Sequence, residues 1–288
     1  METFCSICPN KCNVLRNDNN LGRCTSTNNL KIAKYYLHPY EEPVISGQNG
    51  SGTIFFTGCA LRCVFCQNYE LSRNTRGKEI TPLQLSDIFK ELEDKGAHNI
   101  NLVTPSHYTY QIIEALDIYK PKIPIIYNTH GYELISTLKD IEPYIDVFLP
   151  DLKFKNPIIS KRYALKEDYF KYASESILFM MNAKKTVIEN GLIKSGVIVR
   201  HLILPLCFND SIEIVNWFKQ NKTNGAMFSL MAQYTPFGDI KNYKELSRKI
   251  TKNEYSRVLE ALYELNENEV FIQSLSSSNE KYVPSWDF

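Results

Sequence analysis

The stretch TIFFTGCALRCVFCQN, residues 53–68, decides the fold class of this chain. It opens with a short apolar strand, Thr53–Thr57, and runs directly into a loop that carries Cys59, Cys63 and Cys66. Three thiolates with the spacing C-x3-C-x2-C can ligate three irons of a [4Fe-4S] cluster, whereas clusters that only carry electrons normally have four cysteine ligands. The fourth iron would keep an open coordination site, as catalytic metal centres do. The alternative is a zinc knuckle completed by a remote ligand, although zinc sites usually pair two C-x2-C units.

Beyond this stretch, the chain alternates between short apolar runs and amphipathic segments whose apolar residues recur at three- and four-residue intervals. Such a pattern indicates a parallel sheet covered by helices, a fold that places its chemistry at the carboxyl ends of the strands. The expected strands are Thr53–Thr57, Asn99–Val103, Ile123–Tyr127, Ile145–Leu149, Val197–Leu204 and Met227–Ala232, and the expected helices include Leu83–Lys95, Tyr110–Tyr119, Glu167–Asn190 and Ile212–Asn221. These units predict an α/β fold with a partial (β/α)6 barrel, because a full eight-unit barrel usually needs ~250 residues.

The chain is expected to have three parts. Residues 1–50 are rich in cysteine, asparagine and turn-forming residues, with little periodicity, and are expected to form an irregular Cys-rich N-terminal metal-binding segment. Residues 51–240 should hold the partial barrel. Residues 241–288 should add a helix at Lys252–Asn266, a short strand at Glu269–Gln273 and a tail packed on the barrel.

Four cysteines of the N-terminal segment have the spacing C-x2-C-x3-C-x11-C: Cys5, Cys8, Cys12 and Cys24. Four soft ligands this close in sequence suit either a tetrahedral zinc ion or a second, fully ligated iron–sulfur cluster. A structural zinc would fold a segment that lacks a core of its own, whereas an auxiliary cluster would relay electrons or contact the substrate. The spacing does not decide between the two metals.

Composition narrows the class of protein further. Of 288 residues, 33 are basic and 32 acidic, and a net charge of +1 gives no reason to expect nucleic acid or a membrane surface as a partner. Apolar runs fall short of the ~20 residues that cross a bilayer, and the first residues do not resemble a signal peptide, so the expected location is the cytoplasm. Thiols stay reduced there, which favours metal binding over disulfides for the eight cysteines.

The cluster loop also resembles a known family. The pattern C-x3-C-x-aromatic-C, with Phe65 as the aromatic residue, is similar to the signature of the radical S-adenosylmethionine (SAM) superfamily. Five further segments resemble an uncharacterised branch related to pyruvate formate-lyase activating enzymes: Glu41–Gly47, Asn99–His107, Tyr127–Tyr132, Arg200–Pro205 and Ser229–Tyr234. The resemblance implies a [4Fe-4S] cluster whose open iron binds SAM, and reductive cleavage of SAM to a 5′-deoxyadenosyl radical that abstracts a substrate hydrogen. It also implies a flavodoxin- or ferredoxin-type reductant.

Several residues follow as candidates for the site. Asp151 and Lys153 resemble an Asp-Leu-Lys motif of the activase site and, two apart on a strand, should point to one face. Arg200 resembles a basic position that steadies SAM; as a charge in an apolar strand it needs a partner, either the SAM carboxylate or Asp151. His107 and His130 should face the mouth of the barrel as substrate or proton contacts, with a structural role as the alternative. The expected cofactor-binding residues are Phe65, Arg200, Asn128 and Gln233.

The leading function is hydrogen abstraction from a backbone glycine of a partner enzyme, a glycyl radical enzyme. The activases carry a Gly-Gly-Glu stretch where this chain has Thr104–His107, which puts that substrate in question. The first alternative is a radical SAM enzyme acting on a small molecule or another peptide. From a different class, the alternative is a non-catalytic iron–sulfur electron carrier or a zinc-binding module.

Overall fold

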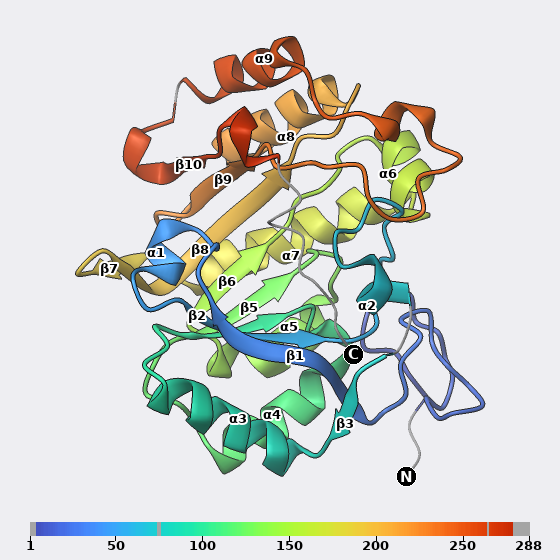
Figure 1. Ribbon diagram of the computed structural model, residues 1–288, viewed down its shortest axis with the longest axis vertical. Coiled ribbons are helices and arrows are strands. Elements are labelled where there is room, and N and C mark those ends of the chain that lie inside the picture. The colour runs from blue at the N-terminus through green and yellow to red at the C-terminus, as the bar shows by residue number, and fades with distance from the viewer. Residues whose placement is uncertain (1–3, 74–75, 264, 279–288) are drawn as a thin grey trace.

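The structure is a computed structural model that describes residues 4–73, 76–263 and 265–278. One open sheet runs through it in the order β10-β9-β8-β6-β5-β4-β2-β1-β3, with β7 paired to β8 (Figure 1). Seven consecutive strands of this sheet run parallel to one another. They are β2 (Ser51–Phe56), β4 (Ile100–Val103), β5 (Ile125–Thr129), β6 (Val147–Pro150), β8 (Leu192–Leu202), β9 (Met227–Met231) and β10 (Val270–Ile272). The α/β class and the partial barrel expected from the sequence are confirmed.

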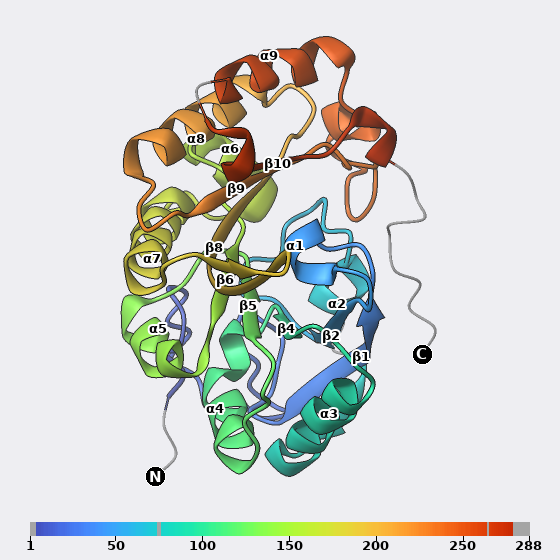
Figure 2. The ribbon, with the colours of Figure 1, turned by 90° about the vertical axis from the view of Figure 1, so that its left-hand side faces the viewer.

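Helices cover the outer face of this curved sheet, as Figures 1 and 2 show. They are α3 (Pro82–Asp94), α4 (Thr109–Ile118), α5 (Ile135–Ile141), α7 (Tyr169–Ala183) and α8 (Phe208–Asn221), with α9 (Lys252–Leu262) packed outside α8. The start of α3 illustrates how local sequence sets where a helix begins. The Thr81 hydroxyl accepts from the Gln84 amide, the Gln84 side-chain oxygen accepts from the Thr81 amide, and Pro82 occupies the first turn. Among the described helices, none has both the length and the apolar composition that a bilayer crossing requires.

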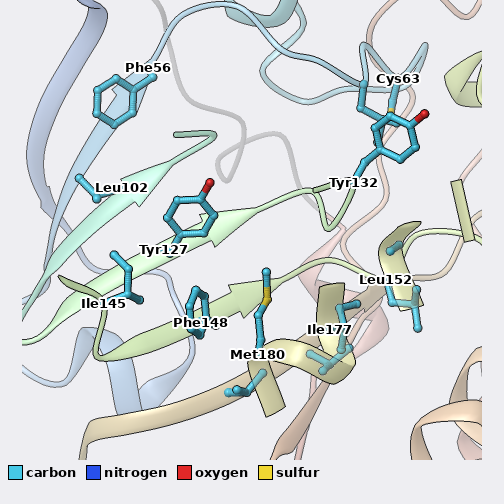
Figure 3. Packing of buried hydrophobic residues seen from close by; sticks show 14 of the residues in the cluster. Phe56, Cys63, Leu102, Tyr127, Tyr132, Ile145, Phe148, Leu152, Ile177 and Met180 are labelled. Carbon is cyan, nitrogen blue, oxygen red and sulfur yellow. The ribbon is translucent and has the colours of Figure 1, made fainter. Parts of the chain in front are cut away.

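The alternation of side chains along each strand separates a core layer from a site layer. In β5, Tyr127 points toward the helices and joins the main core, whereas Ile126 and Asn128 point to the concave face. Figure 3 shows part of the core layer, in which the Tyr127 ring lies 6.0 Å from the Phe148 ring of β6, with Met180 of α7 alongside. The concave face is closed at the amino ends of the strands by Ile45 of the short helix α1 (Pro43–Ser46).

The N-terminal segment is less irregular than the sequence indicated. Residues 30–38 form β1 (Leu30–His38), which pairs antiparallel with β2 and with the short strand β3 (Lys78–Ile80). The strand was missed because it lies at the margin of the sheet, where most of its side chains are half exposed and its apolar alternation is weak. The sheet therefore draws strands from all three expected parts of the chain, and the division at residues 50 and 240 stays a prediction.

Two helix boundaries were also wrong. The helix expected at Glu167–Asn190 ends at Ala183, and β7 (Val187–Glu189) then pairs with β8 through a turn at Asn190–Gly191. Both turn residues have positive φ, 51° and 76°, as a tight Asn-Gly hairpin requires. The helix expected at Lys252–Asn266 ends at Leu262. Residue 264 of that expected helix, residues 1–3 of the N-terminal segment and residues 279–288 of the tail lie outside the described residues.

Candidate active site

A cavity of about 230 Å³ lies on the concave face of the sheet. Its wall brings together the cluster loop and residues from strands that are far apart in sequence. Of the candidates predicted from the sequence, ten line this cavity: Cys59, Cys63, Phe65, Cys66, Asn128, His130, Asp151, Lys153, Arg200 and Gln233. Within the described residues, His107 and the cysteines of the N-terminal segment are not part of its lining.

The cluster loop leaves β2 through Gly58, which has a φ of +85°. A Cβ at this position would collide with the Ser26 hydroxyl and lie 2.6 Å from the Cys24 carbonyl oxygen, so only glycine fits between the loop and the N-terminal segment. Further along, the Phe65 ring contacts the rings of Phe154, Tyr163 and Tyr234 edge-on, with distances of 6.0, 6.4 and 6.4 Å between the ring centroids. These contacts anchor the loop from one side.

The three thiols of the loop fit a cluster. Burial raises the pKa of Cys59 to about 11, although the backbone amides of Arg62 and Leu61 partly offset it. Burial likewise raises the pKa of Cys66, and the Ser72 hydroxyl acts in the opposite direction. A metal that supplies positive charge would favour the thiolate form of these cysteines, and the hydrogen bonds already directed at the sulfurs are of the kind that tune iron–sulfur clusters.

Neither cysteine set shows single-ion geometry. Within residues 4–73, 76–263 and 265–278, no three Cys, His, Asp or Glu side chains gather closely enough to ligate one metal ion. A [4Fe-4S] cluster differs from a single ion, because each thiolate binds its own iron.

A charged network fills the wall opposite the loop. Arg200 of β8 donates from Nε to Asp151 Oδ1 (2.9 Å), from Nη1 to Glu41 Oε2 (3.2 Å) and from Nη2 to Asn128 Oδ1 (2.6 Å). Lys153 Nζ lies 2.5 Å from the other Asp151 oxygen. Burial alone would raise the pKa of Asp151, but the charges of Arg200 and Lys153 outweigh it and lower that pKa. Arg200 thus has the partners that its buried position demanded, since it pairs with Asp151 and Glu41, and Lys153 pairs with Asp151 as well.

Glu41 is the residue of this network that sequence reasoning did not select. Besides Arg200, its carboxylate accepts from Asn101 Nδ2 at 3.0 Å, and its side chain is 12% exposed. Burial raises its pKa, and Arg200 acts in the opposite direction. The segment Glu41–Gly47 entered the family resemblance, but nothing local in the sequence shows that a residue before the barrel reaches across to β8.

The two histidines lie in different places. His130 follows β5 and lines the cavity; its Nδ1 accepts the Tyr132 amide at 3.1 Å, so the proton of the neutral ring resides on Nε2, which has no partner among the described residues. His107 is 1% exposed and lies against the back of the loop, 2.7 Å from the Thr57 carbonyl. His130 can donate a hydrogen bond into the cavity, whereas His107 holds the start of the cluster loop.

The N-terminal cysteines pack directly on the cluster loop. The Cys59 amide donates to the Cys24 carbonyl at 3.2 Å, and Asn10 Nδ2 bridges Cys8 Sγ (3.4 Å) and the Ala60 carbonyl (3.0 Å). A Cβ at Gly22 would lie 3.5 Å from Cys12 Sγ and 3.6 Å from Cys24 Sγ, so these two sulfurs flank the same point. The Arg23 amide also donates to Cys12 Sγ at 3.2 Å. Hydrogen bonds to Cys8 Sγ and Cys12 Sγ are of a kind that also occurs at thiolate-bound metals, but among the described residues no three of these sulfurs gather around one point.

Known proteins match these features. Residues 53–194 match the family model of the radical SAM superfamily. The chain is 28% identical over 274 residues to uncharacterized protein MJ0674 of Methanocaldococcus jannaschii, covering 91% of this chain and 75% of that protein. Its fold is similar to Streptococcus suis SuiB bound to the precursor peptide SuiA (TM-score 0.50, 11% identity) and to methylornithine synthase, PylB (TM-score 0.51, 16% identity).

The two structural matches cover 75% and 74% of this chain but 46% and 60% of those proteins, so the chain spans roughly half their length. At these identities they bear on the fold alone. The cysteine loop after the first parallel strand, the open parallel sheet and the family match over residues 53–194 agree with one another, and on this evidence the chain contains a radical SAM domain.

Proposed function

We propose that this chain reductively cleaves SAM at a [4Fe-4S] cluster held by Cys59, Cys63 and Cys66, and abstracts hydrogen from a backbone glycine of a partner protein. The match of residues 53–194 to the radical SAM superfamily supports the first half of this proposal. When bound, the cluster and SAM supply a 5′-deoxyadenosyl radical. The protein's own residues bind, orient and shield the reacting groups.

The observation that carries the proposal is the composition of one cavity. Its wall holds the three loop thiols together with the buried ion network of Arg200, Asp151 and Lys153. We propose that Arg200 and Lys153 steady the carboxylate of SAM, because their charge-assisted hydrogen bonds suit that group. His130 would donate from Nε2 to the cofactor or the substrate. Gln233, whose side-chain oxygen accepts from Gln273 Nε2 at 3.1 Å, would complete the far wall.

We propose a macromolecular substrate because segments such as Glu41–Gly47 and Tyr127–Tyr132 resemble the activating enzymes, which act on partner proteins. A loop of a partner protein would enter from the opening and exclude water as it does so. The structural neighbour SuiB has been crystallised with a precursor peptide, and a peptide substrate is a related possibility for this chain.

A small-molecule substrate is the second candidate, and one observation favours it. Oppositely charged side chains, Asp151 with Lys153 and Glu41 with Arg200, lie on the same wall. A zwitterion with an amino and a carboxylate group would find a partner for each charge there.

The experiment that tests the proposal starts with anaerobically reconstituted, reduced protein and SAM. We expect release of 5′-deoxyadenosine and methionine, and no release from the Cys59/Cys63/Cys66 triple alanine variant. Absence of SAM cleavage by the wild type would favour the electron carrier or the zinc module.

Substrate class is decided in the same assay with added partners. Candidate glycyl radical enzymes should yield a glycyl doublet in electron paramagnetic resonance. Deuterium transfer from a labelled metabolite into 5′-deoxyadenosine, with no doublet from any such enzyme, would select the small-molecule reading.

We further propose that Cys5, Cys8, Cys12 and Cys24 bind a metal of their own. The proposal is supported by the packing of this segment on the cluster loop and by the hydrogen bond from the Arg23 amide to Cys12 Sγ. The triple alanine variant should retain about one zinc or about four irons per chain. Retention of neither metal would leave the N-terminal cysteines without a metal role.

A further inference from the structure

One side of β1 is left unpaired beside the cavity, near the margin of the sheet (Figure 1). The strand pairs with β2 along residues 32–38, whereas its other side pairs with β3 only at residues 30–32. Within the described part of the chain, the backbone of residues 35–37 makes no hydrogen bond beyond the pairing with β2. Because alternate residues of a strand direct their N–H and C=O groups to opposite sides, this side presents backbone groups that a further strand can bind.

Proteins usually protect such an edge with charge, proline or a bulge. In β1 these features are confined to one end: the pairing with β2 shifts between Ile32 and Lys34, and Lys34 is exposed. At the other end, the His38 carbonyl accepts from the Ser46 hydroxyl at 3.3 Å. Residues 35–38 include no proline and no charge, since burial lowers the pKa of His38 and keeps its ring neutral near neutral pH. We name residues 35–38 the open edge of β1.

The open edge leads into the cavity. His38 lines the cavity, and Tyr36, two residues before it, lies on the same side of the strand. The Tyr36 ring is stacked on the Phe55 ring, with 5.8 Å between the centroids and an interplanar angle of 18°. The His38 ring meets the Tyr36 ring edge-on at 5.5 Å, and the Tyr36 hydroxyl lies 3.2 Å from His38 Nδ1. An aromatic surface therefore runs from the open edge to the cavity wall.

The opening of the partial barrel lies on the same side. The sheet ends with β10 at one margin and with β1 and β3 at the other, and these margins do not pair within the described residues. A segment added to the open edge would extend the sheet into this opening, and its side chains on the concave face would meet Tyr36 and His38. An extended polypeptide presents N–H and C=O groups at the spacing that such an edge requires.

We propose that the open edge of β1 binds the substrate polypeptide as an additional β-strand, with an aromatic side chain of that segment packed against Tyr36 and His38. Main-chain hydrogen bonds provide the affinity, and the contact between rings selects the segment. This inference rests on the proposed function, because it names how a protein substrate is held, but it does not depend on cleavage of SAM.

The test measures peptide binding to the full, reconstituted chain without SAM or reductant. The probe is a displayed library of short random peptides with a fixed central glycine, and enriched sequences are remade as fluorescent peptides for anisotropy. We expect these sequences to share an aromatic residue. N-methylation of alternate peptide positions, which removes the N–H groups directed at β1, should weaken binding by about tenfold or more. Methylation of the positions between them should have a much smaller effect.

Substitutions in the chain locate the site. Tyr36→Glu places a charge beside the open edge and should weaken binding by about tenfold or more, whereas Tyr36→Leu removes only the ring and should weaken it about two- to tenfold. Tyr263→Glu, at a tyrosine that is 81% exposed and follows α9, is the matched control and should leave the affinity unchanged. Iron content and circular dichroism show whether each variant is folded. If Tyr36→Glu is not, the N-methyl series on the wild type decides.

Failure to enrich any peptide, or equal effects of N-methylation at all positions, would overturn the proposal. So would peptide binding that survives Tyr36→Glu in a folded variant. Enrichment only of peptides that match residues 279–288 would assign the edge to the chain's own C-terminal segment, and a dimer that Tyr36→Glu dissociates would assign it to a second copy; either result also overturns the proposal. Because SAM and reductant are absent, an alternating N-methyl effect supports the docking even where SAM is not cleaved.

Discussion

At the scale of single residues, the cavity is organised by Arg200. Its three donor groups are directed to three different acceptors, and two of these are carboxylates: Asp151, which also pairs with Lys153, and Glu41. Removing one partner of a buried ion pair costs about 3–5 kcal/mol, because an uncompensated charge remains. The guanidinium therefore supports the site and presents positive charge to it.

Replacing Arg200 by Lys should weaken SAM binding more than it disturbs the cluster. Lysine keeps the charge but loses the planar fork, so one or more charge-assisted bonds disappear. At roughly 1.5–3 kcal/mol for such a bond, the dissociation constant of SAM should rise about ten- to a hundred-fold, as measured by calorimetry on reconstituted protein. Arg162→Lys, at an exposed ion pair with Glu245, is the matched control. Unchanged SAM affinity in the Arg200 variant would make the residue structural.

The buried carboxyl group of Glu133 makes the free energy of unfolding depend on pH. Glu133 is 1% exposed and accepts from the hydroxyls of Ser106 and Thr129, while its Oε2 has no partner among the described residues. Burial raises its pKa to about 7, although the two hydroxyls partly offset it. The folded state then holds its proton more tightly than the unfolded state, so this contribution to stability is full below pH ~4.5 and is lost as the pH rises through 7.

The Glu133→Gln variant should lack this pH dependence. Between pH 5 and pH 8, the free energy of unfolding of the wild type should fall by roughly 2–3 kcal/mol relative to the variant, by the conversion of 1.36 kcal/mol per pKa unit. Anaerobic denaturant titrations at both pH values measure the difference. Parallel stability curves would show that Glu133 remains ionised in the folded protein.

At the scale of elements, the cluster loop and the N-terminal segment form one unit. Three contacts join them: the Cys59–Cys24 backbone bond, the Asn10 bridge to Ala60 and the close approach at Gly58. The loop after β2 is therefore shaped by a segment that precedes it by more than thirty residues. Its geometry depends on both cysteine sets being in place.

Substituting Gly58 by Ala should disrupt this unit. Positive φ costs a non-glycine residue about 1–3 kcal/mol, and the new Cβ would also collide with Ser26 and Cys24. We expect loss of half or more of the bound iron and a lower Tm. Gly191→Ala is the control, because Gly191 also has positive φ but has nothing within 4 Å of its Cβ position. Equal effects of the two substitutions would show that backbone strain alone, and not the packing of the two elements, is responsible.

At the scale of the whole molecule, one sheet unites the chain. β1 covers the edge of β2, a strand buried along its entire length, and Ile45 closes the concave face from beneath. Neither lies within residues 51–240. An exposed sheet edge and an uncovered apolar face favour aggregation over folding.

A fragment of residues 51–240 should therefore fail to fold cooperatively. A fragment of residues 30–288 keeps β1 and α1, and we expect it to show a single unfolding transition by circular dichroism while lacking the N-terminal metal. Cooperative unfolding of the shorter fragment would support the division of the chain into three parts.

Local sequence was sufficient wherever a short stretch encodes its own structure. The apolar run before Gly58, the spacing of three cysteines and the alternation of strands with amphipathic helices predicted the parallel sheet and the cluster loop, because burial and ligand spacing are local properties. The helix boundary at Ala183 was predictable in principle from Asn190–Gly191, a strong hairpin signal that the longer helical pattern obscured.

Tertiary structure decided what depends on distant segments. β1 is a strand because β2 supplies its hydrogen bonds, Glu41 belongs to the site because α1 folds under the sheet, and His107 faces away from the cavity because the Thr57 carbonyl accepts its proton. The docking of Cys24 on Cys59 is of the same kind. Each of these contacts joins residues at least thirteen positions apart, where no periodicity or spacing in the sequence records which backbone or charged group will be the partner.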